Sequence, residues 1–363
     1  MKNTFGNNVK ITLFGESHGP CVGYVIDGLA PGLSVDAEYI AQLLSRRRPA
    51  GEMSTTRCEK DHFVIESGVF NGFTTGTPIC IRIPNEDARS AEYAQDDRPA
   101  RPGHADMTAQ MKYHGYEDYR GGGHFSGRVT AALVAAAGIV MPALEKKGIR
   151  IATHIRRLGG VEDRLFMDMA LDVEQLKLAD FPVLDAESAV KMKQSIIDAK
   201  ADKDSVGGVL ETVVIGMPAG VGEPWFDTVE GTLSHALFSI PAVKGVEFGD
   251  GFTLADMCGS QANDQWRMSD KPYTITNHNG GINGGITNGM PLLFRCAVKP
   301  TPTIGKAQTT ISLQNGTEVI IANEGRHDPC IVHRAAVVVD AVTALTLCDL
   351  LATRFGTDWL SDV

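Results

Sequence analysis

Four short segments of the chain combine glycine with histidine, arginine or aspartate, a combination that can hold charged groups around a small ligand. The first is Phe14–Pro20, in which His18 lies between Gly15 and Gly19 directly after a run of strand-forming residues. An imidazole titrates at about pH 6.5, so His18 is suited to giving or taking a proton near neutrality. The same residues also suit an ordinary turn with a solvated histidine, and both interpretations remain open.

The second segment, Arg101–Asp106, contains another histidine in a loop fixed by proline and glycine. Asp106 stands two residues after His104, where it can either orient the imidazole ring or cap the helix that follows. A His-x-Asp pair also occurs in metal sites. However, no H-E-x-x-H motif or cluster of carboxylates accompanies it, so the sequence predicts no metal.

The third segment, Arg120–Arg128, precedes a predicted helix and begins with three glycines after its first arginine. Backbone amides, the Ser126 hydroxyl and two guanidinium groups at a helix start suit a phosphate. The segment resembles a nucleotide-binding P-loop, but Arg128 and Val129 stand where lysine and serine or threonine are required, which disfavours a nucleoside triphosphate. A purely structural turn is the alternative.

The fourth segment is Gly325–Cys330, again before a predicted helix. Pro329 favours an extended backbone at Asp328 and so helps to present its carboxylate, although Asp328 is equally suited to capping the helix. Lys299–Thr303 follows an apolar strand and forms a rigid, hydroxyl-bearing loop that suits a second phosphate.

The charge distribution indicates a small anionic ligand. The formal net charge is −10, which argues against a nucleic-acid-binding protein. Arginines nevertheless crowd the first third of the chain, a pattern typical of a focused anion site. They are Arg46, Arg47, Arg48, Arg57, Arg98, Arg101, Arg120 and Arg128.

The remaining composition predicts a cytoplasmic protein with no membrane partner. The 7 cysteines are scattered and include no C-x-x-C pair, as expected for reduced thiols. The chain shows no run of about 18 apolar residues, and its first residues lack the features of a signal or transit peptide.

Hydrophobic periodicity predicts a mixture of strands and helices. Strands are expected over 9–14, 22–27, 62–70 and 79–83, and helices over 36–48, 128–147, near 186–200 and over about 335–352. Gly148 is the expected cap of the 128–147 helix, and residues 85–103 are expected to form a surface loop.

A weak internal repeat links the two halves of the chain. Residues 68–78 match 281–291 in three glycines, a threonine and a proline at one constant offset, and Arg120 and Arg128 match Arg326 and Arg334. The matches indicate a duplicated unit with halves of about 1–160 and 190–355. Chance matching in a glycine-rich chain is the alternative, and a different strand order in the two halves would exclude duplication.

Together these segments resemble those of the chorismate synthase family. The matching motifs, in family order, are G-E-S-H-G from residue 15, R-R-R-P from 46, R-P-G-H-A-D from 101, D-Y-R-G-G-G from 118, A-V-K-G-V-E from 242, K-P-T from 299 and G-R-H-D-P-C from 325. They cover nearly the whole chain, and seven ordered motifs are far more specific than any one glycine loop.

The resemblance implies an α+β fold, a β-α-β sandwich with helices packed between antiparallel sheets, in one domain over residues 1–363. It implies a lyase of the shikimate pathway that forms chorismate by 1,4-elimination of phosphate and a ring hydrogen from 5-enolpyruvylshikimate-3-phosphate. Reduced FMN is required although the reaction involves no net redox change. A homotetramer is also implied, with the flavin reduced either by the enzyme's own NAD(P)H-dependent activity or by an external reductase.

The resemblance also assigns residues. His18 is implied to face the phosphate, His104 to lie near the flavin pyrimidine edge and Asp328 to keep flavin N5 able to accept the ring hydrogen. The flavin positions are His124, Phe125, Ser126, Pro241, Ala242, Gly284, Lys299, Pro300, Thr301, Pro302, Thr303 and Arg326. Arg47 matches a substrate or NADP position, and we add Arg46, Arg120, Arg128 and Arg334 as candidate ligands of the anionic substrate.

This chain departs from the common family pattern at three places. His124-Phe125 replaces Arg-Ser, Pro302-Thr303 replaces Ser-Ser, and Met53 replaces an arginine, which weakens the case for NADP binding and favours an external reductase. Two other functions are considered. An FMN-dependent oxidoreductase would need a dinucleotide site, and no G-x-G-x-x-G follows a predicted strand, while a catalytically silent homologue would not need the histidines and the aspartate.

Overall fold

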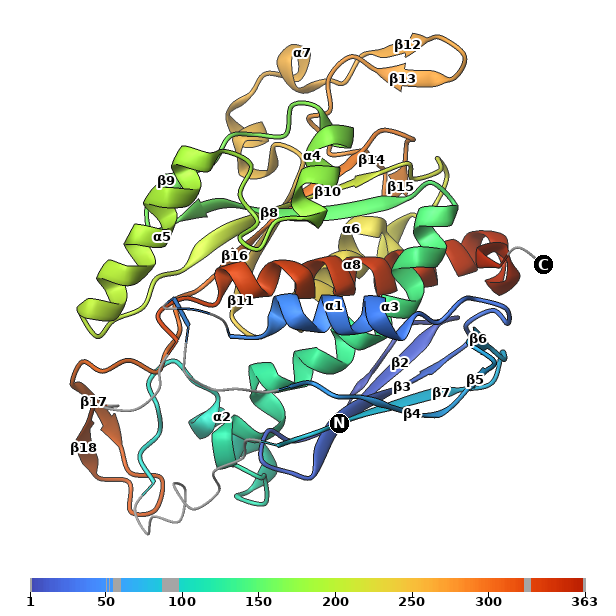
Figure 1. Ribbon diagram of the computed structural model, residues 1–363. Coiled ribbons are helices and arrows are strands. Elements are labelled where there is room, and N and C mark those ends of the chain that lie inside the picture. Colours follow the sequence, from blue (N-terminus) through green and yellow to red (C-terminus); the bar gives the residue numbers. More distant parts are fainter. Residues whose placement is uncertain are drawn as a thin grey trace.

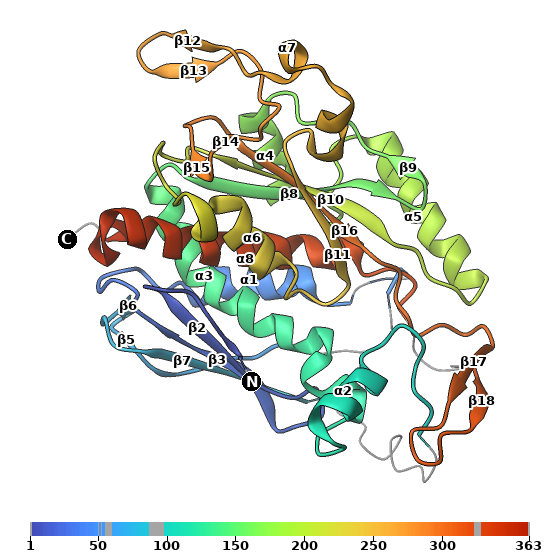
Figure 2. The same ribbon diagram turned by 180° about the vertical axis from the view of Figure 1, so that it is seen from behind.

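The computed structural model describes residues 2–49, 51, 53–54, 60–86, 98–322 and 328–361. Two five-stranded antiparallel sheets face each other across a layer of helices (Figures 1 and 2). The first sheet has the order β1 (Thr4–Phe5), β2 (Lys10–Gly15), β3 (Cys21–Asp27), β7 (Ile79–Pro84) and β4 (Val64–Ser67). The second has the order β11 (Val243–Phe248), β16 (Leu292–Val298), β10 (Gly208–Ile215), β8 (Arg150–Leu158) and β9 (Val161–Glu162). The predicted α+β class is confirmed.

Four helices lie between the sheets, and two cover the outer face of the second sheet (Figure 1). The inner helices are α1 (Ala37–Arg47), α3 (Thr130–Lys146), α6 (Val229–Leu237) and α8 (Val332–Phe355), and the outer ones are α4 (Met169–Lys177) and α5 (Ala186–Ala201). Alternation along the strands explains this layering. Ile151 and Val214 face the main core, whereas their neighbours Ala152 and Val213 pack with residues of α4 in a separate cluster.

The smaller elements project from these layers. They are β5 (Val69–Phe70), β6 (Phe73–Thr74), α2 (Asp106–Tyr113), α7 (Gly259–Ala262), β12 (Trp266–Met268), β13 (Pro272–Thr274), β14 (Ile282–Asn283), β15 (Ile286–Thr287), β17 (Gln308–Ile311) and β18 (Glu318–Ile321). The β12–β13 hairpin extends away from the body (Figure 1), while β17–β18 lies near α2 at the opposite end. An isolated bridge between Pro99 and Ser312 joins the loop before α2 to the β17–β18 hairpin.

The two longest apolar helical segments form the centre of the molecule. Gly127–Lys146 and Val332–Phe355 are long and apolar enough to cross a bilayer, yet 89% and 100% of their most hydrophobic stretches are buried inside the protein. A helix that is apolar on all sides needs contacts all around it, and α8 obtains them from α3, α6 and β8. The sequence had predicted α8 somewhat too short.

A buried carboxylate on α8 fixes the loop before β2. Asp349 accepts hydrogen bonds from the backbone amides of Asn7, Asn8 and Val9 at 2.9, 2.7 and 2.9 Å. Three amide donors on one carboxylate satisfy a charge that would otherwise be costly to bury. The bonds therefore join the start of the first sheet to the last long helix.

The two halves use the same strand order. The order β2-β3-β7-β4 of the first sheet corresponds to β8-β10-β16-β11 of the second, with hairpin β5–β6 corresponding to β14–β15. A buried threonine fixes the hairpin in each half. Thr74 donates to Ala30 O at 2.7 Å and accepts from the Leu33 amide at 2.9 Å, and Thr287 makes the same two bonds at the same distances with its own half.

A fully buried histidine, His154, belongs to β8 and pairs with Glu211 of β10. His154 Nδ1 is 2.8 Å from Asp163 Oδ2, and its Nε2 is 3.0 Å from Glu211 Oε2. Burial alone would lower the pKa of His154, but the hydrogen bonds to the two carboxylates raise it above its usual value. Because both ring nitrogens face acceptors, the folded state favours the imidazolium.

This imidazolium makes stability depend on pH. A raised pKa in the folded state contributes stability that is fully present below the unfolded pKa of about 6.5, and that is lost as the pH rises through the folded pKa. We expect the free energy of unfolding to fall as the pH rises above about 6.5, and His154→Gln to remove that part of the decline. Urea unfolding of the wild type and of His154→Gln at several pH values between about 6 and 9 measures this pH dependence. Parallel plots of unfolding free energy against pH for the two proteins would contradict the expectation.

Candidate active site

His18 lies in the loop between β2 and β3 and is only 9% exposed. The loop is held by the Ser17 amide, which donates to Gly123 O at 3.1 Å. The His18 ring occupies the space beside Gly121, where a Cβ atom would lie 2.3 Å from the ring Cδ2 atom. Gly121 also has a φ of +60°, so the ring and the backbone both require glycine here. The interpretation of His18 as a solvated turn residue is therefore wrong.

His104 occupies the corresponding space beside the next glycine. A Cβ atom on Gly122, whose φ is +87°, would lie 3.0 Å from the Cε1 atom of His104. Two imidazoles that are far apart in the sequence thus lie against consecutive glycines of one segment. The two rings therefore lie close to the same short stretch of backbone.

Three guanidinium groups lie close to one another, and one of them, that of Arg128, is linked to the His18 loop through the side chain of Asn85. Arg47 Nη2 lies 2.9 Å from Asp61 Oδ2, and Arg128 Nη1 pairs with the other oxygen of the same carboxylate. Burial lowers the pKa of the Arg47 guanidinium, and the positive charges of Arg128 and Arg334 act in the same direction, although Asp61 opposes them. One carboxylate between two arginines leaves net positive charge, as an anion site requires.

Asp328 belongs to this cluster, because its Oδ2 lies 2.6 Å from Nη2 of Arg334. The N-cap position of α8 is occupied by Ile331, so Asp328 is not the helix cap that the sequence also allowed. Among the described residues, four polar atoms of the site and the nearby loops are buried without a hydrogen-bond partner. They are Ser17 Oγ, Arg47 Nε, Thr301 Oγ1 and Arg334 Nε. Such atoms point to a polar ligand.

Two predicted anion ligands make other contacts, and one predicted cofactor position is not described. Arg46 reaches the backbone oxygen of Leu176 at 3.5 Å and does not join the cluster. Arg120 is partly exposed at the rim, where it pairs with Asp118 at 2.7 Å. Arg326 lies outside the described residues.

The predicted phosphate loop Lys299–Thr303 contacts both the His104 loop and the segment before β11. The Lys299 amide donates to Ala242 O at 2.9 Å, and its Nζ donates to Gly103 O. Ala242 has a φ of +76°, an uncommon value for a residue with a side chain. Backbone strain of this kind gathers at functional positions and is consistent with a binding role for Pro241–Ala242.

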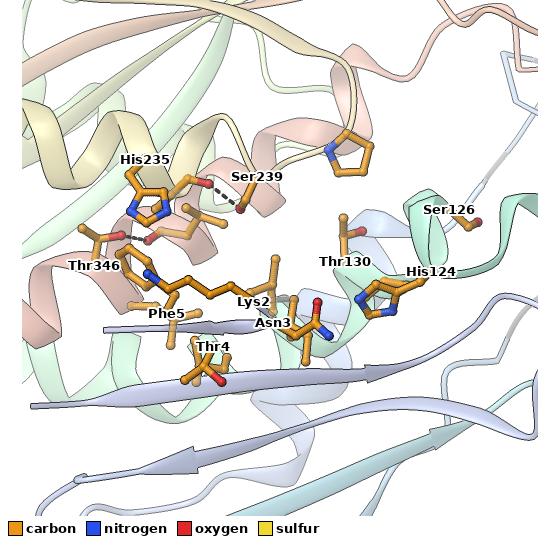
Figure 3. A pocket seen from close by; sticks show the side chains of 18 residues that line it. Lys2, Asn3, Thr4, Phe5, His124, Ser126, Thr130, His235, Ser239 and Thr346 are labelled. Carbon is orange, nitrogen blue, oxygen red and sulfur yellow. Dashed lines mark hydrogen bonds between the residues drawn. The ribbon is translucent and has the colours of Figure 1, made fainter. Parts of the chain in front are cut away.

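A largely apolar cavity of about 270 Å³ lies beside the glycine segment (Figure 3). His124 and Ser126 line one end, and His235 on α6 lines the other. Pro241 also belongs to the lining. The walls come from β1, β2, α3, α6 and α8. His235 was missed by the sequence analysis because an isolated histidine on an amphipathic helix gives no signal.

The remaining predicted cofactor positions do not all lie together. His124 is held by its Nδ1 atom, 2.7 Å from Gly15 O, whereas Phe125 is 38% exposed and packs edge-on against Tyr113 at a ring distance of 6.0 Å. Gly284 lies in the exposed turn between β14 and β15, away from β17–β18 and the other cofactor positions (Figures 1 and 2). Met53 packs against the main core.

Comparison with known proteins identifies the family. The family model described as chorismate synthase matches residues 9–352. This chain belongs to the chorismate synthase family. A chorismate synthase of Thermococcus gammatolerans is 47% identical over 351 residues, covering 96% of this chain and 97% of the relative. A chorismate synthase of Dehalococcoides mccartyi is 45% identical over 360 residues, covering 98% of each.

A solved structure agrees with this assignment. The crystal structure of a chorismate synthase superposes with a TM-score of 0.76 and 29% identity, covering 97% of this chain and 94% of that one. The family membership makes this protein a carbon–oxygen lyase of the shikimate pathway.

Proposed function

We propose that this protein converts 5-enolpyruvylshikimate-3-phosphate to chorismate, eliminating the phosphate and a ring hydrogen. The observation that carries the proposal is the pair of imidazoles, His18 and His104, on consecutive glycines beside a cluster of buried arginines. Proton-transfer groups and an anion site are the two things that phosphate elimination needs from side chains.

The arginines match the charge of this substrate. Two carboxylates and a phosphate give about −3.5 to −4 near neutrality. Arg47, Arg128 and Arg334 supply guanidinium groups, whose planar geometry suits carboxylate and phosphate. The orphaned Nε atoms of Arg47 and Arg334 are the donors that we assign to the anion.

Within this arrangement His18 donates a proton to the leaving phosphate, and the arginines neutralise its charge. Asp328 is held in place by Arg334 at 2.6 Å, which fixes its carboxylate beside the anion. Closely spaced charges of this kind act most strongly where water is excluded, and Arg47 and Arg128 are both buried.

Reduced FMN is the cofactor that we propose for this site, and the residues present fit it. The cavity beside His124, Ser126 and Pro241 is apolar, as a flat ring system requires, and Thr301 Oγ1 with Lys299 offers donors for a phosphate. When bound, reduced flavin supplies the electron and hydrogen transfer that side chains cannot supply. The protein residues bind, orient and shield it.

An anaerobic assay tests the proposal. The full chain is mixed with 5-enolpyruvylshikimate-3-phosphate and chemically reduced FMN, and chorismate and phosphate are measured together. We expect equimolar formation of both, and essentially none with oxidised FMN. Phosphate without chorismate, or net flavin oxidation in step with product, would instead support a different reaction. A chorismate synthase relative assayed in parallel excludes failure of the reagents.

We further propose that the protein assembles as a homotetramer, works in the cytoplasm and depends on an external reductase. Support for assembly comes from large exposed apolar side chains, among them Trp225, Phe226 and Phe252. All six described cysteines are free thiols, as a reducing compartment favours. Sedimentation equilibrium tests the assembly, and brisk NADPH oxidation by the isolated protein with FMN would overturn the external reductase.

We also propose that the chain arose by duplication of a half-length unit. The equal strand order, the matched hairpins and the equivalent bonds of Thr74 and Thr287 support it. The connection between β2 and β3 is a short loop that carries His18, whereas the connection between β8 and β10 contains β9, α4 and α5. A structural superposition of the two halves tests the proposal, and a poor fit of the corresponding strands would contradict it.

A further inference from the structure

Three side chains of the Arg101–Asp106 segment form a compact group. The guanidinium of Arg101 holds the Asp106 carboxylate through two bonds of 2.7 Å, from Nε to Oδ2 and from Nη2 to Oδ1. The Arg101 amide adds a third bond of 3.0 Å to Oδ2. The same Oδ1 atom also lies 2.8 Å from His104 Nδ1.

The Asp106 carboxylate does not cap helix α2. The N-cap of α2 is Ala105, which makes no side-chain cap bond, and Asp106 is the first residue of the helix itself. Its oxygens accept from Arg101 and His104. Helix capping therefore does not explain why an aspartate stands at this position.

The charge of Asp106 decides where the proton of His104 resides. Burial would raise the pKa of Asp106, but the hydrogen bonds from Arg101 and His104 hold it well below its usual range. Asp106 is thus an anion at any working pH and can only accept. Arg101 Nη2, 3.2 Å from His104 Nδ1, can only donate. With the carboxylate as its partner, Nδ1 carries a hydrogen.

We propose that Arg101 and Asp106 are positioning residues that hold His104 as the Nδ1–H tautomer, so that Nε2, on the edge of the ring near Gly122, is the nitrogen presented to the ligand. Nε2 lies 3.2 Å from the point that a Cβ of Gly122 would occupy, on the edge of the ring away from Asp106. In the neutral ring Nε2 is an acceptor, and on protonation it becomes a donor aimed at the same place. The expected effect of these residues on turnover rests on the proposed function, whereas the expected tautomer of His104 does not.

Arg101 fixes the orientation of the Asp106 carboxylate. A carboxylate with only one imidazole partner is free to rotate, whereas the paired guanidinium bonds fix its plane and therefore the plane of the His104 ring. All three side chains are mostly buried, with exposures of 22% for Arg101, 18% for His104 and 13% for Asp106. Water competes little with these bonds.

The tautomer is measured directly by nitrogen-15 NMR of the full chain labelled at histidine. The His104 signals are identified by their absence in His104→Gln. We expect wild-type His104 to carry its proton on Nδ1, and Asp106→Ala to lose that preference. Asp106→Glu keeps a carboxylate and is expected to recover much of it. A wild-type proton on Nε2, or an unchanged tautomer in Asp106→Ala, would overturn the proposal, and neither measurement needs substrate.

Turnover provides the second readout. In Asp106→Ala we expect kcat to fall about 10–100-fold, the size typical of losing a residue that orients a functional histidine, with little change in KM. Asp106→Glu should recover part of kcat. The matched control is Asp168→Ala, which removes a carboxylate that caps the start of α4 by accepting from Ala170 and Leu171. Equal losses in Asp106→Ala and Asp168→Ala would mean that Asp106 is only structural and would refute the proposal.

Discussion

Replacing His18 by alanine is expected to lower the rate of chorismate formation by about 10²–10⁴-fold, the usual contribution of a general acid. The His18 ring lies on Gly121 beside the arginine cluster, so its removal takes away the proton donor and leaves the anion ligands in place. FMN affinity should change little. Rapid-mix measurement of phosphate release with reduced FMN under anaerobic conditions gives the rate.

Two further variants make this result specific. His18→Gln keeps a polar side chain but cannot deliver the proton, so it should be about as slow as His18→Ala. Recovery of the rate by glutamine would assign His18 a structural role. The control is His114→Asn at an exposed position with a φ of +59°, a backbone conformation that asparagine tolerates. It should turn over at the wild-type rate.

Removing the carboxylate of Asp61 is expected to produce the largest loss of stability in the site. Its side chain is fully buried between Arg47 and Arg128, whose side chains are 9% and 3% exposed. Asp61→Ala leaves two buried guanidinium groups without their common partner, which costs about 3–5 kcal/mol. The free energy of unfolding from urea titration measures the loss. The KM for substrate should also rise, because the two arginines separate.

An exposed ion pair in the same half is the matched control. Arg82 and Glu66 lie 2.9 Å apart, but 42% and 44% of their side chains are exposed. Glu66→Ala is therefore expected to change stability by no more than about 0.5 kcal/mol. Similar losses of unfolding free energy in Asp61→Ala and Glu66→Ala would show that Asp61 does not stabilise the two buried guanidinium groups.

Local sequence signals predicted much of the first half of the fold. Asp36 caps α1 by accepting from Glu38 and Tyr39, and the expected helix over 36–48 is confirmed as Ala37–Arg47. The strands expected over 9–14, 22–27 and 79–83 are confirmed as β2, β3 and β7. In each case, alternation or helical spacing on one buried face produced a clear pattern.

The missed elements lacked such a pattern. Helix α6 is short and has a glycine, Gly231, in its first turn, and α4 lies in a charged stretch whose apolar residues contact only the outer face of the second sheet. The second sheet also pairs strands far apart in the chain, such as β10 with β16. Pairing of this kind depends on tertiary contacts that no local window contains.

For the site, motif order pointed to the histidines and Asp328, and spacing suggested Asp106 as a partner of His104, but Asp61 was missed. Asp61 belongs to no recognisable motif, yet it joins two of the predicted arginines. Arg46 and Arg47 are adjacent, so the side chains of this helical pair point to different faces, and only Arg47 reaches the cluster. Sequence spacing alone did not show which of these two arginines would reach the cluster.

The bonds from Asp349 to the amides of Asn7, Asn8 and Val9 have a consequence for folding on the ribosome. They join residues more than 300 positions apart, so this contact cannot form until nearly all of the chain has been synthesised. Until then α3 and the inner face of the second sheet lack α8, and their apolar residues are exposed to other chains. Contacts of such high sequence separation fold slowly. The growing chain is therefore most prone to aggregation in the interval before its last helix emerges.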